Sequence, residues 1–500
     1  NDQNLGSAGL PFSINITGNA IDYSDGPSAR KVLQELFLAN RSSHSNKNLN
    51  QAWAYFGLLF YFDVIETEPS AVEFNITCDD GVSDSQCEVS TCETNSTIEN
   101  DILYYSVEKD AATNVPINMA TSFLDLDFIY GSSEEESNLI RTFEGGKIRL
   151  TGQGLPETYV DEYGQTQWLV LDQRITQFPG TFALAVMLMR NHNKYAEVFS
   201  NSTYLEYLED VYSCEPKPCT EWIEEDFFQA ARMFTIARYQ HVCSNQYGPI
   251  VLNMTSSAFL APNEDVLDDP TLDTLAAIAF RWPYFALGPV DRVIDDNWNI
   301  DPKFDLTPVG SICSYEEMNE MIQSSGINGI LRGMALSPGA ETNSYLPPRT
   351  STDCLDWPVF DIQTSRDFGT PSYNDVREGL GMERLTTLEE LTADDVALEA
   401  LNSLYDGDVD KVDFLVGCVV EDKEENDVIG AVLRKILWKK IYEIHSSDSL
   451  YHDHENVLTD ARYASIYEIA ADNPDPIGAF STELIENIVF PENDFLLTVK

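Results

Sequence analysis

Positive charge is scarce in this sequence. Its 500 residues contain 30 Lys and Arg against 83 Asp and Glu, which gives a formal net charge of −53, and only 6 histidines. No basic patch with interleaved aromatic residues occurs, so nucleic acid and anionic membrane surfaces are excluded as partners. The excess of acid instead favours solubility and weak binding of divalent cations.

Long apolar runs are also missing. A membrane-spanning helix needs roughly 20 apolar residues, and the apolar segment 55–65 is too short for that role. GxSxG, HExxH, CxxC and P-loop patterns are absent as well. The chain starts at Asn1 without a charged and apolar leader, and we expect that any signal peptide has been removed.

Two features predict secretion. Six N-x-Ser/Thr sequons occur, at Asn15, Asn40, Asn75, Asn95, Asn201 and Asn253. The nine cysteines include two close sets, Cys78/Cys87/Cys92 and Cys214/Cys219, whose spacing suits local disulfide loops. Because nine is odd, one thiol is expected to be free or to link a second chain, with Cys418 and Cys243 the least obviously paired. A homo-oligomer or a disulfide-linked dimer therefore remains open.

Helical patterns dominate the chain. Residues 182–199, 224–242 and 427–445 carry buried stripes or charges that suit a helix dipole, whereas strand-like alternation is short and rare. Repeats and low-complexity linkers are absent. The sequence predicts a mainly α protein with long irregular connections, built as an extended N-terminal arm over residues 1–45 and a single helical domain over 46–500.

Five ordered blocks resemble a known family. They are "SFLDLDFIYGSSEEESNLIR" (122–141), "GTFALAVMLMRNHNKYA" (180–196), "FRW" (280–282), "QTSRDFGTPSYNDVR" (363–377) and "VDKVDFLVGCVVED" (409–422). In order and spacing they resemble the signature blocks of the animal haem peroxidases, over residues 50–490. The resemblance implies a large helical domain around a haem, with a calcium ion beside the distal helix.

The resemblance also implies where the haem chemistry should lie. On the distal side, Leu58 aligns with a glutamine of the family, Tyr61 with an ester-forming aspartate and Phe62 with the distal histidine. Arg174 aligns with the family's arginine, and Gln177 aligns with an ester-forming glutamate. On the proximal side, Tyr284 aligns with the proximal histidine and Asp361 with the asparagine that orients it. A phenyl ring cannot transfer a proton, a contribution typically worth about 10²–10⁴-fold in rate. None of the six histidines lies in the frame needed to replace those lost.

The calcium positions are retained. By the same resemblance, Asp63 follows the distal position, and "TSFLDLD" supplies Thr121, the Phe123 carbonyl, Asp125 and Asp127. Carboxylate, hydroxyl and carbonyl oxygens are the ligands that Ca²⁺ prefers. Asp127 replaces a serine of the family and adds a charge to the predicted site.

These positions predict a secreted, glycosylated, calcium-binding protein that has lost haem and is not an enzyme. Its role would be structural, in the extracellular matrix, in a body fluid or as a carrier. The rings expected to fill the haem volume are Phe60, Tyr61, Phe62, Phe178, Tyr284 and Phe285, and an apolar small ligand such as a pigment or lipid is the other possible occupant. The alternative is a peroxidase-like or catalase-like haem enzyme in which Tyr284 is the axial iron ligand, since tyrosine holds the haem iron in catalase.

Overall fold

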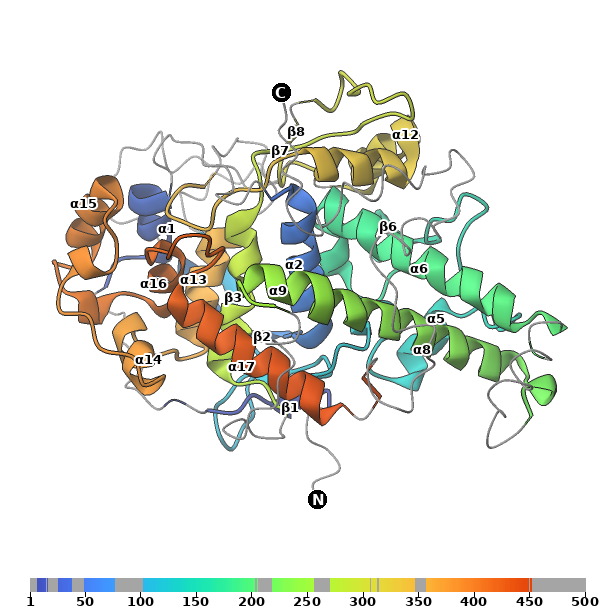
Figure 1. The fold of residues 1–500 in the computed structure, drawn as a ribbon, viewed down its shortest axis with the longest axis horizontal. Helices are drawn as coiled ribbons and strands as arrows, with labels where there is room; N and C mark the ends of the chain where they lie inside the picture. The colour runs from blue at the N-terminus through green and yellow to red at the C-terminus, as the bar shows by residue number, and fades with distance from the viewer. Residues whose placement is uncertain are drawn as a thin grey trace.

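A helix buried on every side runs through the middle of the molecule. The computed structural model describes residues 7–14, 16, 26–37, 49–76, 102–202, 205, 218–255, 270–305, 307–312, 314–346, 357–448 and 450–451. Within it, all 14 residues of α2 (Gln51–Val64) are buried, and the Asn50 side chain caps the helix by accepting a hydrogen bond from the Ala52 amide. Figure 1 shows α2 between α6 on one side and α13 and α16 on the other.

Close packing around α2 explains a glycine within it. A Cβ atom at Gly57 would collide with the hydroxyl of Tyr247 and would lie 2.9 Å from the ring of Pro283. Glycine is disfavoured inside helices by roughly 0.5–1 kcal/mol relative to alanine. The close approach of two neighbouring segments is the reason that α2 tolerates it.

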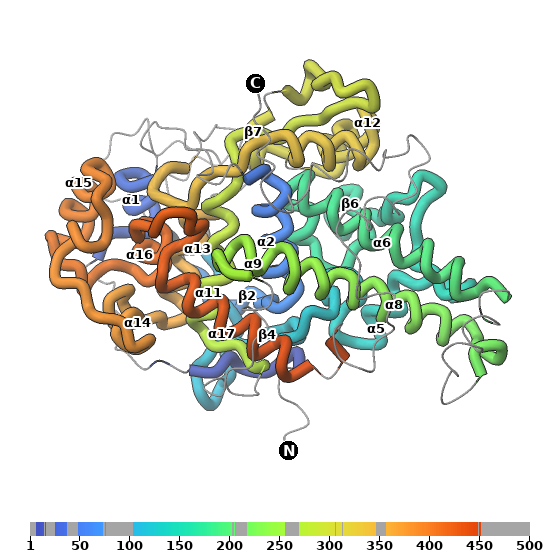
Figure 2. The backbone as a smooth tube through the Cα atoms, in the orientation of Figure 1, coloured from blue at the N-terminus to red at the C-terminus, as the bar shows by residue number. Residues whose placement is uncertain are grey.

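Three long helices lie around α2, and two of them confirm predicted helical segments. α6 (Pro179–Phe199) and α8 (Glu224–Val242) pack against each other, and α12 (Tyr315–Leu336), which the sequence analysis did not predict, packs on α6 and α2; the smooth trace in Figure 2 shows the same arrangement. The bounds of α8 are those predicted. α17 (Ala431–Ser447) begins four residues later than predicted because Gly430 occupies its N-cap in an extended conformation.

The other elements are short. The remaining α-helices are α1 (Ala29–Val32), α4 (Asp127–Tyr130), α5 (Glu134–Ile140), α9 (Gly248–Val251), α11 (Thr274–Ala279), α13 (Trp357–Asp367), α14 (Tyr373–Gly379), α15 (Asp395–Leu404) and α16 (Phe414–Val420). The 3-10 and π turns are η2 (Leu33–Phe37), η3 (Gln173–Thr176), η4 (Cys219–Glu221), η5 (Cys243–Tyr247), η6 (Trp282–Ala286), η7 (Leu388–Glu390) and η8 (Val409–Lys411).

Strands in the described residues form isolated antiparallel pairs. β1 (Leu10–Pro11) pairs with β4 (Ile117–Asn118), β2 (Pro69–Ile76) with β3 (Ile102–Val107), β5 (Thr158–Val160) with β6 (Thr166–Trp168), and β7 (Val290–Asp291) with β8 (Thr307–Pro308). The prediction of a mainly α fold with long irregular connections is confirmed.

Part of the predicted extended arm is helical. Residues 29–37 form α1 and η2, and the side chains of Val32, Leu36 and Phe37 are buried in the main hydrophobic core. The Gly, Ser and Asn residues on either side of this segment hid its short apolar stripe. The division into an arm and a single domain stays a prediction, although one hydrophobic cluster extends from Phe12 to Tyr451.

The described residues include some of the cysteines and sequons named in the sequence analysis. Cys219 is disulfide-bonded, while Cys243 and Cys418 are free thiols that lie buried, so neither reaches the surface to link a second chain. Asn201 and Asn253 are exposed. Cys78, Cys87, Cys92, Cys214, Asn15, Asn40 and Asn95, and the side chain of Asn75, lie outside the described residues.

No helix in the described part of the chain has both the length and the apolarity to cross a membrane.

A buried carboxyl group lies beside the first turn of α2. Asp291 on β7 is 5% exposed and accepts hydrogen bonds from the hydroxyl of Tyr55 and, at 3.3 Å, from the amide of Gln51. Its second oxygen, Oδ2, has no partner. Burial raises the pKa of Asp291 to about 7, so the folded state holds a proton there that the unfolded chain releases at lower pH.

We predict that Asp291→Asn flattens the pH dependence of stability. Because the folded-state pKa is raised, the contribution of Asp291 is complete below pH 4 and is lost as pH rises through about 7. As the pH rises across this interval, the free energy of unfolding of the variant should therefore increase relative to that of the native chain, by up to about 4 kcal/mol. Denaturant unfolding of both proteins between pH 4 and 8 measures the difference, and parallel pH profiles would contradict the prediction.

Candidate functional site

Four segments bring a set of aromatic rings together beside α2. The aromatic cluster consists of Tyr61 and Phe62 on α2, Phe178 before α6, Tyr284 in η6 and Trp357 at the start of α13. Ring centroids lie 6.2 Å apart for Tyr61 and Tyr284, 6.0 Å for Phe178 and Tyr284, and 5.6 Å for Phe178 and Trp357. These are distances of direct contact between aromatic side chains.

Tyr284 is a neutral, hydrogen-bonded phenol in this cluster. It is 5% exposed, and its hydroxyl donates to Oε1 of Gln177 at 3.1 Å. Burial is the largest cause that raises the pKa of Tyr284 well above its usual value, and the electrostatic effect of the neighbouring Tyr61 is the second. The partner of the Tyr284 hydroxyl is thus the residue at the position of the ester-forming glutamate, Gln177.

Arg281 and Asp361 form a buried ion pair at the edge of the cluster. Nη1 of Arg281 lies 2.5 Å from Oδ1 of Asp361, and the guanidinium lies 5.2 Å from the centroid of the Tyr61 ring. Nε of Arg281 donates no hydrogen bond. The residue at the position of the orienting asparagine is therefore held by an arginine and does not contact Tyr284 through a hydrogen bond.

Arg174 holds the C-terminal end of α2. Its guanidinium bonds both carboxylate oxygens of Asp172, at 3.0 and 2.8 Å, and donates to the carbonyls of Phe62 and Ile65 at 3.1 and 2.6 Å. A positive group at the last carbonyls of a helix satisfies free acceptors and complements the helix dipole.

The aromatic cluster does not fit a haem. The resemblance places Tyr284 on the iron and Gln177 at the haem edge, yet these two side chains are joined directly by a hydrogen bond. Tyr61 and Tyr284, one from each side of the expected haem, are in ring contact. A porphyrin would need these contacts to open, so we derive no reaction step through haem.

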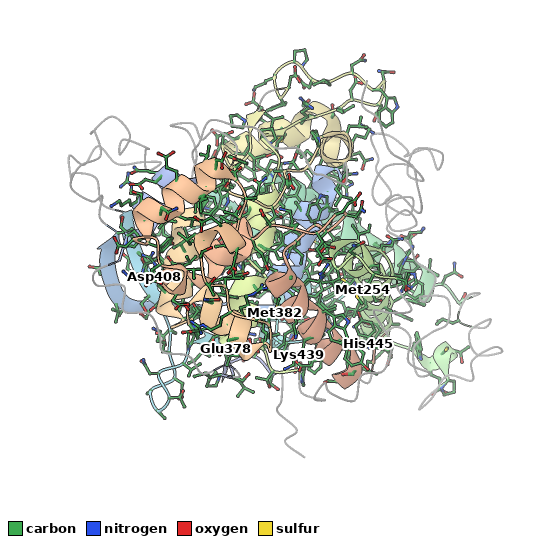
Figure 3. The ribbon with its side chains drawn as sticks, turned by 60° about the vertical axis from the view of Figure 1, so that its left-hand side comes forward. Met254, Glu378, Met382, Asp408, Lys439 and His445 are labelled. Carbon is green, nitrogen blue, oxygen red and sulfur yellow. The ribbon has the colours of Figure 1, made fainter. Side chains whose placement is uncertain are left out.

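The histidines that the structure describes lie elsewhere. His192 is buried on α6, where its two ring nitrogens bond the hydroxyl of Tyr130 at 2.9 Å and the carbonyl of Gly146 at 2.8 Å. Burial lowers the pKa of His192 to about 4, so the ring is neutral. His241 bonds Asn245 within its own helical segment, and His445, labelled in Figure 3, lies on α17 against Tyr451.

Three aspartates, Asp63, Asp125 and Asp127, form an acidic group immediately beyond the aromatic cluster. Oδ1 of Asp63 accepts a hydrogen bond from the backbone amide of Asp127 at 2.6 Å, and Asp127 accepts one from the Ser132 hydroxyl at 2.6 Å. Oδ2 of Asp63 and Oδ1 of Asp125 are buried and have no partner. In the described residues no Lys, Arg or His forms an ion pair with any of the three.

Backbone strain shapes the loop that carries these acids. Leu126, between Asp125 and Asp127, has φ 60° and ψ 45°, the left-handed region that branched or bulky residues rarely adopt. Its side chain is fully buried, and its carbonyl accepts hydrogen bonds from the amides of Ile129 and Tyr130. The strain is characteristic of functional loops, and here it aims the Asp127 amide at Asp63.

Burial is the main cause that raises the affinity of the acidic group for protons. Burial, followed by Asp125, raises the pKa of Asp63 well above its usual value and that of Asp127 to about 8. Burial raises the pKa of Asp125 to about 6. As they are arranged, no group of three or more His, Cys, Asp or Glu side chains in the described ranges has its ligand atoms gathered as a metal ion requires.

Sequence reasoning missed several members of the site. Trp357 carries no pattern that assigns it to the cluster, and the ring contacts of Phe60 and Phe285 are with Phe280, Tyr247 and Phe37 instead. The positive φ of Leu126 also had no signal in the sequence. Both features arise from packing between segments that are far apart along the chain.

Solved structures share the fold. Peroxidase A from Dictyostelium discoideum superposes with a TM-score of 0.74 at 19% identity, covering 96% of each chain. A fatty acid alpha-dioxygenase from Arabidopsis thaliana superposes with a TM-score of 0.73 at 17% identity, covering 93% of this chain and 78% of its own.

The curated relatives are longer proteins than this chain. Peroxinectin A from Dictyostelium discoideum is 23% identical over 368 residues, 69% of this chain and 64% of its own length. A peroxidase from Drosophila melanogaster is 26% identical over 432 residues, 74% of this chain and 57% of its own length. The chain thus spans between half and two thirds of these relatives.

The names of these proteins correct one expectation. The sequence analysis predicted that the chain is not an enzyme, but one of these relatives is named a peroxidase and the structural neighbours are a peroxidase and a dioxygenase, which point to an enzyme. The error lay in reading lost histidines as lost catalysis. Their absence excludes only histidine chemistry, and two buried guanidinium groups and two tyrosines still line the site.

The family itself is shown by a match over most of the chain. The family model described as animal haem peroxidase matches residues 9–472. The match includes both the aromatic cluster and the acidic group. The chain therefore belongs to the animal haem peroxidase family.

Proposed function

We propose that this chain is an extracellular, calcium-binding member of the animal haem peroxidase family. The observation that carries the proposal is the acidic group: three enclosed carboxylates that form no ion pair with a described Lys, Arg or His, two of which have an oxygen that accepts no hydrogen bond. Buried charge without compensation is costly and is usually paired or bound to a metal. The charge of Arg232 acts on Asp125 without an ion pair, and calcium would supply the compensation that the three carboxylates still need.

The ligands would come from two segments. Asp63 would bind from the end of α2, and Asp125 and Asp127 from the loop that follows Thr121. The Thr121 hydroxyl and the Phe123 carbonyl are further oxygens on the same loop, in keeping with the six to eight oxygens that calcium takes. An ion there would tie the loop to the central helix.

Extracellular location is supported by covalent chemistry. Cys219 is disulfide-bonded, and disulfides persist mainly in oxidising compartments. Exposed sequons occur at Asn201 and Asn253. The amide of Asn253 also donates to Oδ1 of Asp427 at 2.8 Å, so glycosylation at this site would cost that hydrogen bond.

We predict that Asp63→Asn and calcium removal have opposite effects on stability. A chelator should lower the melting temperature of the native chain by about 5 °C or more, because a bound ion stabilises the folded state. In chelator, Asp63→Asn should melt above the native chain, because the substitution relieves repulsion from Asp125 and Asp127; in calcium it should melt below it.

Asp395→Asn is the matched control, since Asp395 is an exposed acid in the first turn of α15. It should melt with the native chain in both buffers, within about 2 °C. Identical melting of the native chain with and without chelator would contradict the calcium site.

An oxidoreductase activity is the second candidate function, favoured by the names of the relatives. Its specific form would be a haem held by Tyr284, the residue that the family resemblance aligns with the proximal histidine. That arrangement requires the phenol to leave Gln177 and to lose its proton.

This second candidate predicts a Soret band, about one iron per chain and turnover of peroxide, all lost in Tyr284→Phe. The substitution keeps the ring contacts and removes only the hydroxyl, so retained folding can be verified by the melting temperature. An absorption spectrum without the Soret band, or an iron-loaded Tyr284→Phe protein with unchanged activity, would sink the tyrosine-ligated enzyme.

A further inference from the structure

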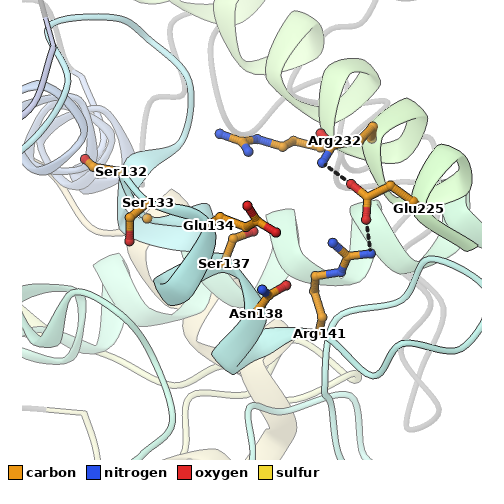
Figure 4. Close-up of a pocket in the computed structure, with 10 residues that line it drawn as sticks. Ser132, Ser133, Glu134, Ser137, Asn138, Arg141, Glu225 and Arg232 are labelled. Carbon is orange, nitrogen blue, oxygen red and sulfur yellow. Dashed lines mark hydrogen bonds and ion pairs between the residues drawn. The ribbon is translucent and has the colours of Figure 1, made fainter.

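A polar cavity lies between α5 and α8, beside the acidic group. Its volume is about 420 Å³, within the roughly 300–1,000 Å³ of small-molecule sites. Figure 4 shows Glu134, Ser137 and Asn138 on α5 across the cavity from Glu225 and Arg232 on α8. The cavity lies apart from the aromatic cluster and its lining is polar, so the functions proposed above do not use this cavity.

Arg232 enters this cavity without a carboxylate partner. Its guanidinium lies 5.0 Å from the centroid of the Tyr130 ring, and no Asp or Glu of the described residues is within ion-pair distance of it. The chain has 83 acids for 30 basic residues. An arginine that remains unpaired in such an acidic protein, and that faces a cavity, is available to an external anion.

The other charged groups of the cavity are already engaged. Arg141 is 4% exposed, and its Nη2 pairs with Glu224 at 2.7 Å and with Glu225 at 2.6 Å. Oε1 of Glu225 also accepts from the amide of Gln229 at 2.8 Å. Glu225 is therefore not free to neutralise Arg232.

Two uncharged side chains complete the set of free groups. The Ser137 hydroxyl and the Asn138 amide face the cavity and make no hydrogen bond to another described residue. Nε of the buried Arg141 is a further donor without a partner. Glu134 is exposed at the rim and can accept from a hydroxyl.

We propose that this cavity binds a small hydroxylated carboxylate of the sugar-acid class. The ligand's carboxylate would take a two-point hydrogen bond from Arg232, the geometry that guanidinium groups favour. Its hydroxyls match Ser137, Asn138 and Glu134. A neutral sugar would leave Arg232 unpaired, and an inorganic anion such as sulfate has no hydroxyl group to donate to Glu134.

The negative charge of the whole chain does not prevent this binding. At physiological ionic strength the Debye length is about 8 Å, so exposed acids farther from the cavity are largely screened. Charges inside the cavity decide the outcome, and there Arg232 is the cation that forms no ion pair, while the carboxylate of Glu134 is exposed at the rim.

Calorimetric titration of the full chain in calcium buffer tests the proposal, with glucuronate as the probe and glucose as its neutral counterpart. Glucuronate should bind saturably and at least about tenfold more tightly than glucose, a difference of about 1.4 kcal/mol. Equal binding of the two sugars, or no binding of glucuronate, would overturn the proposal.

Variants locate the site. Arg232→Gln should weaken glucuronate binding at least about tenfold, whereas Lys435→Gln, the same charge change at an exposed residue of α17, should leave it unchanged. If Arg232→Gln does not fold, Asn138→Leu decides the matter, because it removes the amide and keeps the arginine. Unchanged glucuronate affinity in a folded Arg232→Gln or Asn138→Leu protein would assign the binding to another place and refute the proposed cavity.

Discussion

The complete burial of α2 is the constraint on which the rest of the structure depends. A helix without a solvent-exposed face must find a protein partner for every polar group it carries, because an unmet buried group costs about 1–3 kcal/mol. Tyr55 meets Asp291 near the N-terminal end, and Arg174 meets the carbonyls at the C-terminal end. Asp63 keeps a buried carboxylate oxygen that accepts no hydrogen bond, and near the N-terminal end the Gln51 side-chain oxygen and the Trp53 indole nitrogen are likewise without one.

Two neighbouring residues on this helix face different environments. Phe62 belongs to an aromatic cluster whose rings contact one another. Asp63, the next residue, faces two more carboxylates on a strained loop. The first environment is closed by its own side chains, whereas the second is incomplete without a cation. This contrast is why the calcium proposal rests on the structure more firmly than any reaction at the haem position.

Family membership and site geometry answer different questions. The animal haem peroxidase match establishes the lineage and fold, and the names of the relatives point to an enzyme. The geometry says which groups such a reaction would have to use in this chain. Arg174 and Arg281 are both committed to ion pairs, and Tyr284 is committed to Gln177. Any chemistry here must first break one of these contacts.

Sequence patterns predicted the helices well where the pattern is local. The bounds of α8 follow from its acidic first turn and apolar stripe. The predicted start of α17 lies before the observed one because the apolar stripe does not indicate the bend before Gly430. The family resemblance brought Tyr61, Phe178 and Tyr284 to one place.

Contacts between distant segments could not be predicted from the sequence. Tyr284 and Gln177 are 107 positions apart, and their hydrogen bond depends on how η6 packs beside η3. The same is true of Trp357, of the left-handed Leu126 and of the cavity at Arg232. Each is set by side-chain packing, for which neither periodicity nor composition carries a signal.

Crystallography with calcium present is the most direct test of the central claim. Anomalous scattering from crystals of the native chain should reveal one ion among the carboxylates of Asp63, Asp125 and Asp127, with oxygen distances of about 2.3–2.6 Å. The account predicts that peak and its disappearance in Asp63→Asn. Density for water alone among the three carboxylates, at a calcium concentration that saturates comparable sites, would contradict it.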